Sequence, residues 1–205
     1  MDQVNKQQIE KLCHFACQQS GLALQFVPQE FKTSQLCELA CQNSHWAFKW
    51  VPEHLITHSL AKNMCEKFGG TLEWMPEHLK TPELCKIACK EHGLALKWVP
   101  LSLRTEKLCW IACENEGFSL EHVPKSLRSL EICELACKKR GGALKWVPEP
   151  LKTKKLCKIA CKQNGMALKH VPKALKTKKI CQAACKENNW AFQFVPDNLR
   201  ESLFS

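Results

Sequence analysis

Residues 156–172 read LCKIACKQNGMALKHVP, and this stretch decides how the chain folds. It holds two cysteines four residues apart, then a glycine, then a closing valine-proline pair. Related stretches recur every 24 residues without an insertion. The interval is marked by Pro28, Pro52, Pro76, Pro100, Pro124, Pro148, Pro172 and Pro196, and by Cys17, Cys41, Cys65, Cys89, Cys113, Cys137, Cys161 and Cys185. A fixed period of this length predicts a repeat protein.

The first half of each unit has the pattern of an α-helix. At about 100° per residue, the apolar residues of 84–89 cover an arc of about 200°, which suits a helix packed between two neighbours. Thr81 stands where an N-cap is expected, and Pro82 follows at the first helical position. The threonines at 33, 57, 105, 153 and 177 repeat this signal. Gly93 is expected to end the helix in a left-handed conformation.

The second half predicts a shorter helix, from about residue 94 to residue 98, which ends before Pro100. A strand is the alternative, because the segment is short and partly β-branched. A two-helix unit of this size buries its apolar face only against its siblings. We therefore expect an all-α fold, an α-solenoid of eight 24-residue helical hairpins in a single domain. Its parts are an N-terminal cap at about 1–11 and repeats 12–35, 36–59, 60–83, 84–107, 108–131, 132–155, 156–179 and 180–205.

The segments KQNGMALKHVPKALKT (162–177) and KEHGLALKWVPLSLRT (90–105) resemble a known tandem repeat, the bacterial domain of unknown function family 4116. Units of that family read approximately LxAVKQNGxALxYxxxxL, and the resemblance covers residues 12 to about 200. It implies an all-helical repeat protein of bacterial or phage origin, and it implies no activity. This chain departs from the pattern by placing cysteine where the family has small aliphatic residues.

The cysteines of a unit lie on one helical face, because they are four residues apart. Two thiolates presented in this way could contribute to a zinc site, but zinc needs four ligands, and no unit supplies a second pair. Packing is the favoured interpretation, with cysteine as a small apolar residue between units. Ala61 occupies the place of the first cysteine in one unit, which keeps the small size but not the ligand. We expect no metal and no cofactor.

One aromatic residue breaks a polar column on the outward side of the first helices. The third position of the unit reads His14, Glu38, Lys62, Lys86, Trp110, Glu134, Lys158 and Gln182. A large aromatic side chain in such a column is typical of an interface anchor. The alternative is a single tryptophan that is exposed or folded against a neighbouring side chain.

Positive charge is concentrated in the C-terminal half. Residues 1–102 hold ten basic and ten acidic residues, whereas residues 103–205 hold twenty basic and ten acidic residues. We expect Lys138, Lys158, Lys162 and Lys186 to point outward from the first helices, and a second basic row to follow the turns at Arg128, Lys152 and Lys176. Such rows favour an acidic partner or a phosphate backbone. A face that only keeps the protein soluble is the alternative.

These observations predict a non-enzymatic protein-interaction scaffold, such as a bacterial effector or a phage-encoded inhibitor. Its expected contact residues are Trp110, Lys138, Lys158, Lys162, Lys186, Arg128, Lys152 and Lys176, and its expected partner is an acidic protein. Sequence-independent nucleic-acid binding is the alternative. The first twelve residues, MDQVNKQQIEKL, lack the apolar run of a signal peptide, and no membrane contact is expected. We therefore expect a cytoplasmic location, or the cytosol of a host cell if the protein is exported. The oligomeric state stays open.

Overall fold

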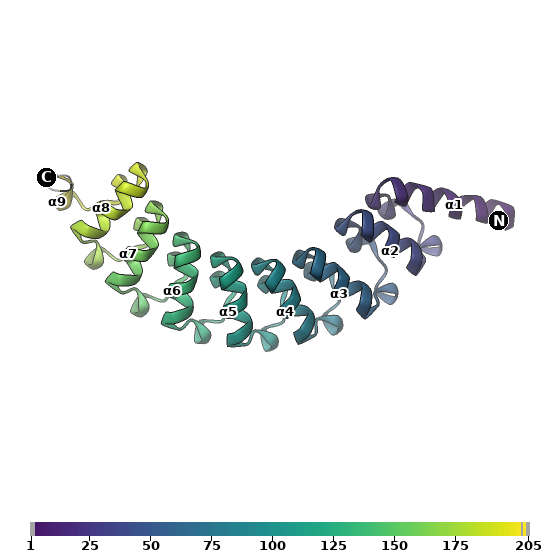
Figure 1. Cartoon of the computed structure of the whole chain (residues 1–205), viewed down its shortest axis with the longest axis horizontal. Coiled ribbons are helices and arrows are strands. Elements are labelled where there is room, and N and C mark those ends of the chain that lie inside the picture. The colour runs from purple at the N-terminus through teal and green to yellow at the C-terminus, as the bar shows by residue number, and fades with distance from the viewer. Residues whose placement is uncertain (1–2, 202, 204–205) are drawn as a thin grey trace. The chain divides into compact units, whose positions relative to one another are not determined.

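The computed structural model describes residues 3–201 and 203. Within these residues all regular structure is helical and no strand occurs, which confirms the all-α repeat fold (Figure 1). The α-helices are α1 Gln3–Gln19, α2 Ser34–Asn43, α3 His58–Lys67, α4 Pro82–Glu91, α5 Glu106–Asn115, α6 Leu130–Lys139, α7 Lys154–Gln163, α8 Lys178–Glu187 and α9 Asp197–Arg200.

Two kinds of 3-10 helix connect them. A six-residue kind follows each of α1 to α8: η1 Gly21–Phe26, η3 His45–Trp50, η5 Gly69–Trp74, η7 Gly93–Trp98, η9 Gly117–His122, η11 Gly141–Trp146, η13 Gly165–His170 and η15 Asn189–Phe194. A three-residue kind lies in the turns: η2 Gln29–Phe31, η4 Glu53–Leu55, η6 Glu77–Leu79, η8 Leu101–Leu103, η10 Lys125–Leu127, η12 Glu149–Leu151 and η14 Lys173–Leu175.

The chain forms two compact units. The first unit comprises residues 1–91 and 98–100, and the second comprises residues 92–97 and 101–205. In the first unit α1 packs on α2, and α3 packs on α4; in the second unit α5, α6, α7 and α8 pack in sequence order. The expected single domain stays a prediction.

The α-helices begin where the sequence predicts. Five threonines accept a hydrogen bond at 3.1–3.3 Å from the backbone N–H three residues later: Thr33, Thr57, Thr81, Thr105 and Thr153. Ser129 does the same for α6. Thr177 precedes α8 without such a bond, and Pro82 is the first residue of α4, as expected. These caps satisfy N–H groups that have no partner inside the helix.

The second segment of each unit is a 3-10 helix, which confirms the expected shorter helix, gives its type and excludes the strand. The buried residues fit this type of helix: in η7 Gly93, Ala95 and Leu96 are buried, Val99 follows as the next buried residue, and Gly93, Leu96 and Val99 stand three residues apart. A spacing of three matches the three residues per turn of a 3-10 helix. Six residues are also too few for a stable α-helix of their own.

The prediction that glycine ends the first helix of a unit in a left-handed conformation is wrong. All eight glycines lie within the described residues, and none of them has a positive φ. Where a glycine begins a long 3-10 helix, it instead touches the following repeat. A Cβ on Gly141 would collide with the carbonyl oxygen of Ala160, and one on Gly165 would collide with that of Ala184. Glycine is therefore required for close approach between backbones.

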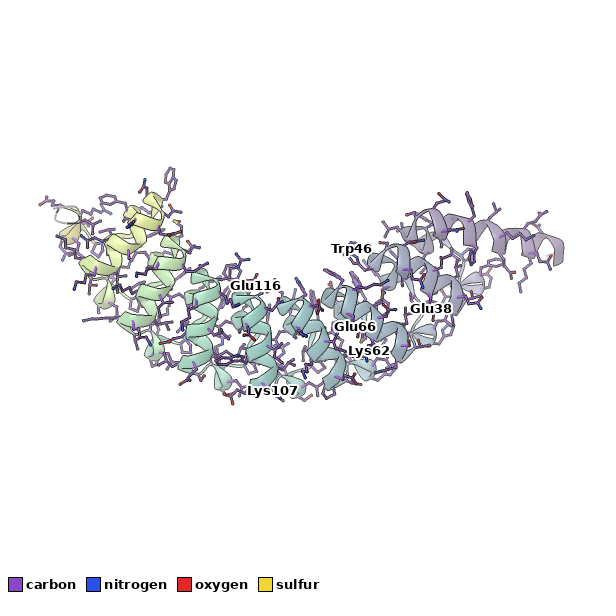
Figure 2. The ribbon with its side chains drawn as sticks, in the orientation of Figure 1. Glu38, Trp46, Lys62, Glu66, Lys107 and Glu116 are labelled. Atoms are coloured by element: carbon purple, nitrogen blue, oxygen red, sulfur yellow. The ribbon has the colours of Figure 1, made fainter. Side chains whose placement is uncertain are left out.

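One repeat replaces this glycine with a large ring. His45 occupies the equivalent position, and its ring lies 4.4 Å from that of Phe68. Trp46 stacks near Phe68 and Trp74, at 6.0 and 5.2 Å between ring centroids, and half of its surface is exposed (Figure 2). Aromatic contacts thus take over from backbone contact at this junction.

A cation in most turns joins one repeat to the next. Lys32, Arg104, Arg128, Lys152 and Lys176 each donate a hydrogen bond to the backbone carbonyl 18 residues later, at the last residue of the next long 3-10 helix. These carbonyls lack a partner inside the helix, so a positively charged donor stabilises them. Ile56 occupies this position in one repeat and is buried.

The apolar core depends on contact between repeats. Leu36 is 3% exposed, but Leu12, the equivalent residue of the first repeat, is 66% exposed. Near the C-terminus of the chain, in the second unit, Leu203 is buried and its carbonyl accepts a hydrogen bond from Gln182. An apolar helix face is therefore covered only where another element packs against it.

We predict that Gly141→Ala lowers the free energy of unfolding by about 1–3 kcal/mol, because the added methyl group meets a backbone carbonyl that cannot turn away. Gly142→Ala is the matched control in the adjacent position. Its Cβ would lie 3.0 Å from the Phe118 ring, a side chain that can move. Urea unfolding of both variants measures the difference, and equal stabilities would contradict the backbone contact.

We predict that Arg128→Met lowers the free energy of unfolding by about 2–3 kcal/mol. Arg128 donates to the carbonyls of Val123, Trp146 and Glu121 at 2.7–3.0 Å, and hydrogen bonds from charged groups are the stronger kind. Lys125→Met, an exposed cation in the same turn, is the control and should change stability by less than about 0.5 kcal/mol. Urea unfolding of both variants measures the two changes in stability. An Arg128→Met variant as stable as the unchanged protein would contradict a structural role for Arg128.

Candidate protein-interaction surface

Trp110 lies on the outer side of α5. It is 39% exposed, so its indole is available at the surface while part of it rests on the repeat. Figure 2 labels Lys107 and Glu116 at opposite ends of this helix, and Trp110 lies between them in the sequence. The helix that carries Trp110 is in contact with α6, the next α-helix of the second unit.

The exposed lysines of α6, α7 and α8 form the largest group of exposed cations in the second unit. We call them the lysine ridge: Lys138, Lys139, Lys154, Lys155, Lys158, Lys162, Lys179 and Lys186. All eight are exposed, which includes the four residues that the sequence predicts to point outward. The other four lie in the same helices, and a count of lysines over each whole helix would have found them.

Acidic residues are fewer on these helices. Glu134 is largely covered, with 16% of its side chain exposed, and lies 3.0 Å from Lys155 in an ion pair. Glu131 and Glu187 are exposed. The face therefore keeps a positive balance, and closely spaced cations of this kind attract negatively charged surfaces.

The three turn cations of the predicted contact set lie elsewhere. Lys152 is buried, and Arg128 and Lys176 are partly covered. All three donate to carbonyls of the next repeat, and Lys152 also forms an ion pair with Glu149. Their charges are thus used inside the fold, where the sequence alone suggested a surface row. The signal that could have separated the two groups is position, because these cations directly precede the N-cap.

Fourteen of the fifteen cysteines are buried, and Cys13 is partly exposed. This confirms the burial expected of packing residues. Removal from water disfavours a thiolate, and burial raises the pKa of Cys113 and Cys137 to about 12. Neighbouring cysteines contribute to this rise in pKa. Among the described residues, no three His, Cys, Asp or Glu side chains are grouped as a metal ion requires, so the zinc alternative gains no support there.

We predict that only Cys13 reacts rapidly with a thiol reagent at pH 8, since the thiolate is the reactive form. The other fourteen cysteines should react only after unfolding. Counting released chromophore from the native protein, with Cys13→Ser as the control, measures this. A second thiol that reacts rapidly in the native protein would contradict the packing.

The same burial predicts a loss of stability at high pH. An unfolded thiol titrates near 9.0, whereas burial raises the pKa of Cys41 and Cys161 in the fold to about 12. The unfolded state therefore releases protons first as the pH rises, and stability should fall from about pH 9 to about pH 12. Thermal melts across this range provide the measurement.

In the described part of the chain, no helix is long and apolar enough to span a bilayer. Neither a curated protein nor a solved structure matches the chain. A family model does match residues 153–200, and its description is Domain of unknown function (DUF4116). The match covers the end of one turn, α7, η13, η14, α8, η15 and α9. The resemblance predicted from the sequence is thereby confirmed for residues 153–200, which match the model of the DUF4116 family, while the bacterial origin stays a prediction.

Proposed function

We propose that this protein is a non-enzymatic interaction scaffold that binds an acidic surface of a partner protein through the lysine ridge, with Trp110 as an apolar anchor beside it. The observation that carries the proposal is the eight exposed lysines on three consecutive helices. Complementary charge speeds encounter and selects partners, whereas a buried aromatic side chain supplies affinity. The ridge and Trp110 offer both.

Uneven charge supports binding over solubility alone. Residues 1–102 have as many acidic as basic residues, so the first half of the chain has no excess charge to keep it soluble. A positive charge needed only for solubility has no reason to be concentrated in one half of the chain. The buried thiols support the absence of catalysis, because a raised pKa favours the unreactive form.

Nucleic-acid binding is the second candidate, favoured by one observation. Lys138, Lys162 and Lys186 occupy the same position in successive repeats, so they form a regular row. A row of this kind can follow a phosphate backbone. The exposed Glu131 and Glu187 on the same helices weaken this candidate, because they repel phosphate while leaving contacts for a protein of mixed charge.

We predict that the combined variant Lys138→Glu, Lys158→Glu, Lys162→Glu and Lys186→Glu binds the partner at least about tenfold more weakly, since it reverses half of the ridge. The control reverses four other exposed lysines of the second unit, Lys125, Lys145, Lys169 and Lys173, and should retain binding. Trp110→Ala should weaken binding without a change in the thermal melt.

The measurement starts with capture from nuclease-treated lysate, followed by titration of the purified partner at several salt concentrations. A single-stranded oligonucleotide serves as the second probe. If the oligonucleotide binds with a steep salt dependence, on the order of one power of salt for each phosphate contacted, the nucleic-acid candidate replaces the first. Equal capture by the ridge variant and its control would remove the ridge from the function.

A further inference from the structure

The second unit contains a hollow of about 210 Å³ that the lysine ridge does not include. Its walls come from four successive repeats and include Phe118, Arg140, Gly142, Asn164, Glu187 and Asn188. Arg140 pairs with Glu116, the residue labelled at the end of α5 in Figure 2, so the hollow lies at that end of the helices. The inference drawn from this hollow rests on the proposed protein-binding function. It specifies which kind of partner segment the chain binds.

The hollow exists because one repeat has no side chain at a position where its neighbours have large ones. Gly142 stands 24 residues from both Phe118 and Met166, the equivalent residues before and after it. The Phe118 ring leans over Gly142, packs edge-on against Trp146 at 5.6 Å, and keeps 36% of its surface exposed. One wall of the hollow is therefore an aromatic ring.

The opposite wall offers hydrogen-bond donors in fixed orientations. Asn164 Oδ1 accepts from the Met166 N–H at 3.0 Å, and Asn188 Oδ1 accepts from the Trp190 N–H at 2.9 Å. Because the oxygen of each amide is held by the backbone, the NH₂ group of each points away from it. Gln163 is different, because both ends of its amide are used within the fold. Its oxygen accepts from the Gly141 N–H and its NH₂ group donates to the Lys139 carbonyl.

The charges at the hollow select a neutral group. Glu187 lines it, and Glu116 holds the Arg140 guanidinium through Nε and Nη2 at 3.1–3.4 Å. A carboxylate or phosphate in the hollow would face Glu187 and compete with Glu116 for Arg140. A neutral acceptor, such as a backbone carbonyl, meets the two asparagine NH₂ groups without that repulsion.

The spacing of the donors points to an extended chain. Asn164 and Asn188 are one repeat apart, and packed helices are separated by about 8–10 Å. Carbonyls of a polyproline II chain point the same way every three residues, about 9.3 Å, whereas those of a β-strand do so about every 7 Å. Trp190, whose N–H bonds to Asn188, is exposed in the repeat after that of Asn164. Aromatic grooves of this kind suit extended segments.

We propose that this site binds an extended segment of a partner protein in polyproline II conformation. Asn164 and Asn188 donate to two backbone carbonyls three residues apart, and a neutral apolar side chain of the segment enters the hollow beside Phe118. The lysine ridge attracts the partner as a whole, while the hollow recognises this one segment.

The probe is a phage-displayed library of random twelve-residue peptides, panned against the full chain. The selected peptide is synthesised with a fluorescent label and titrated by anisotropy. The double variant Asn164→Asp and Asn188→Asp keeps the oxygen that caps each backbone N–H and removes both donors, so binding should weaken about tenfold or more. Gly142→Met, which fills the hollow with the side chain of the next repeat, should weaken it as much.

The control variant, Gln193→Glu with Asn198→Asp, makes the same change of charge at exposed positions outside the hollow and should bind the peptide as the unchanged protein does. Thermal melts of all variants establish that each is folded. The inference is overturned if panning enriches no peptide, or if the asparagine variant binds as tightly as the control.

The two proposals fail separately. If the hollow variants bind the purified acidic partner normally and the ridge variant does not, the proposed scaffold function stands and the segment-binding site is wrong. If the ridge variant and its control bind that partner equally while the asparagine variant loses the peptide, the ridge is wrong and the site stands.

Discussion

The fold depends on one close approach, that of a glycine at the start of most long 3-10 helices to the carbonyl of an alanine in the next α-helix. This contact brings the two backbones together with no side chain between them, and it requires small residues on both sides. Alanine and cysteine at the flanking helical positions follow from the same requirement, because both are small and tolerate burial. The turn cation then fixes the register by reaching the far end of the next long 3-10 helix. Close packing and a charged hydrogen bond thus hold opposite ends of each such junction.

Much of this could be predicted from the sequence, because the features involved are local. The period, the threonine caps, the first-position proline and the burial of cysteine each depend on residues within a few positions of one another. The second helix was harder. Its apolar residues fit a short α-helix by composition, and only the spacing of Gly93, Leu96 and Val99 indicates three residues per turn. Contact with the next repeat then decides the conformation.

The roles of glycine and of the turn cations could not be predicted, because both depend on partners 18 or 19 residues away in a neighbouring repeat. Glycine after a helix is typical of a left-handed cap, and nothing local distinguishes that role from close approach. Arg128, Lys152 and Lys176 likewise form a periodic basic row with the same spacing as the exposed Lys138, Lys162 and Lys186. Periodicity alone does not separate a cation that serves the fold from one that faces solvent. The hollow at Gly142 did leave a signal, a glycine in a column whose other members, apart from Gly70, are large side chains.

The close-fitting junction also has an evolutionary consequence. Most repeats meet their successor through a backbone contact or a bond from a turn cation to a carbonyl, and both contacts require the full interval of 24 residues. A deletion of one or two residues within a repeat would displace the glycine, the turn cation and the N-cap from their partners at the same time. Such an array changes its length by the gain or loss of whole repeats, while side chains on its outer faces diversify freely. Substitution then alters the outer surface of such an array, whereas duplication alters its length.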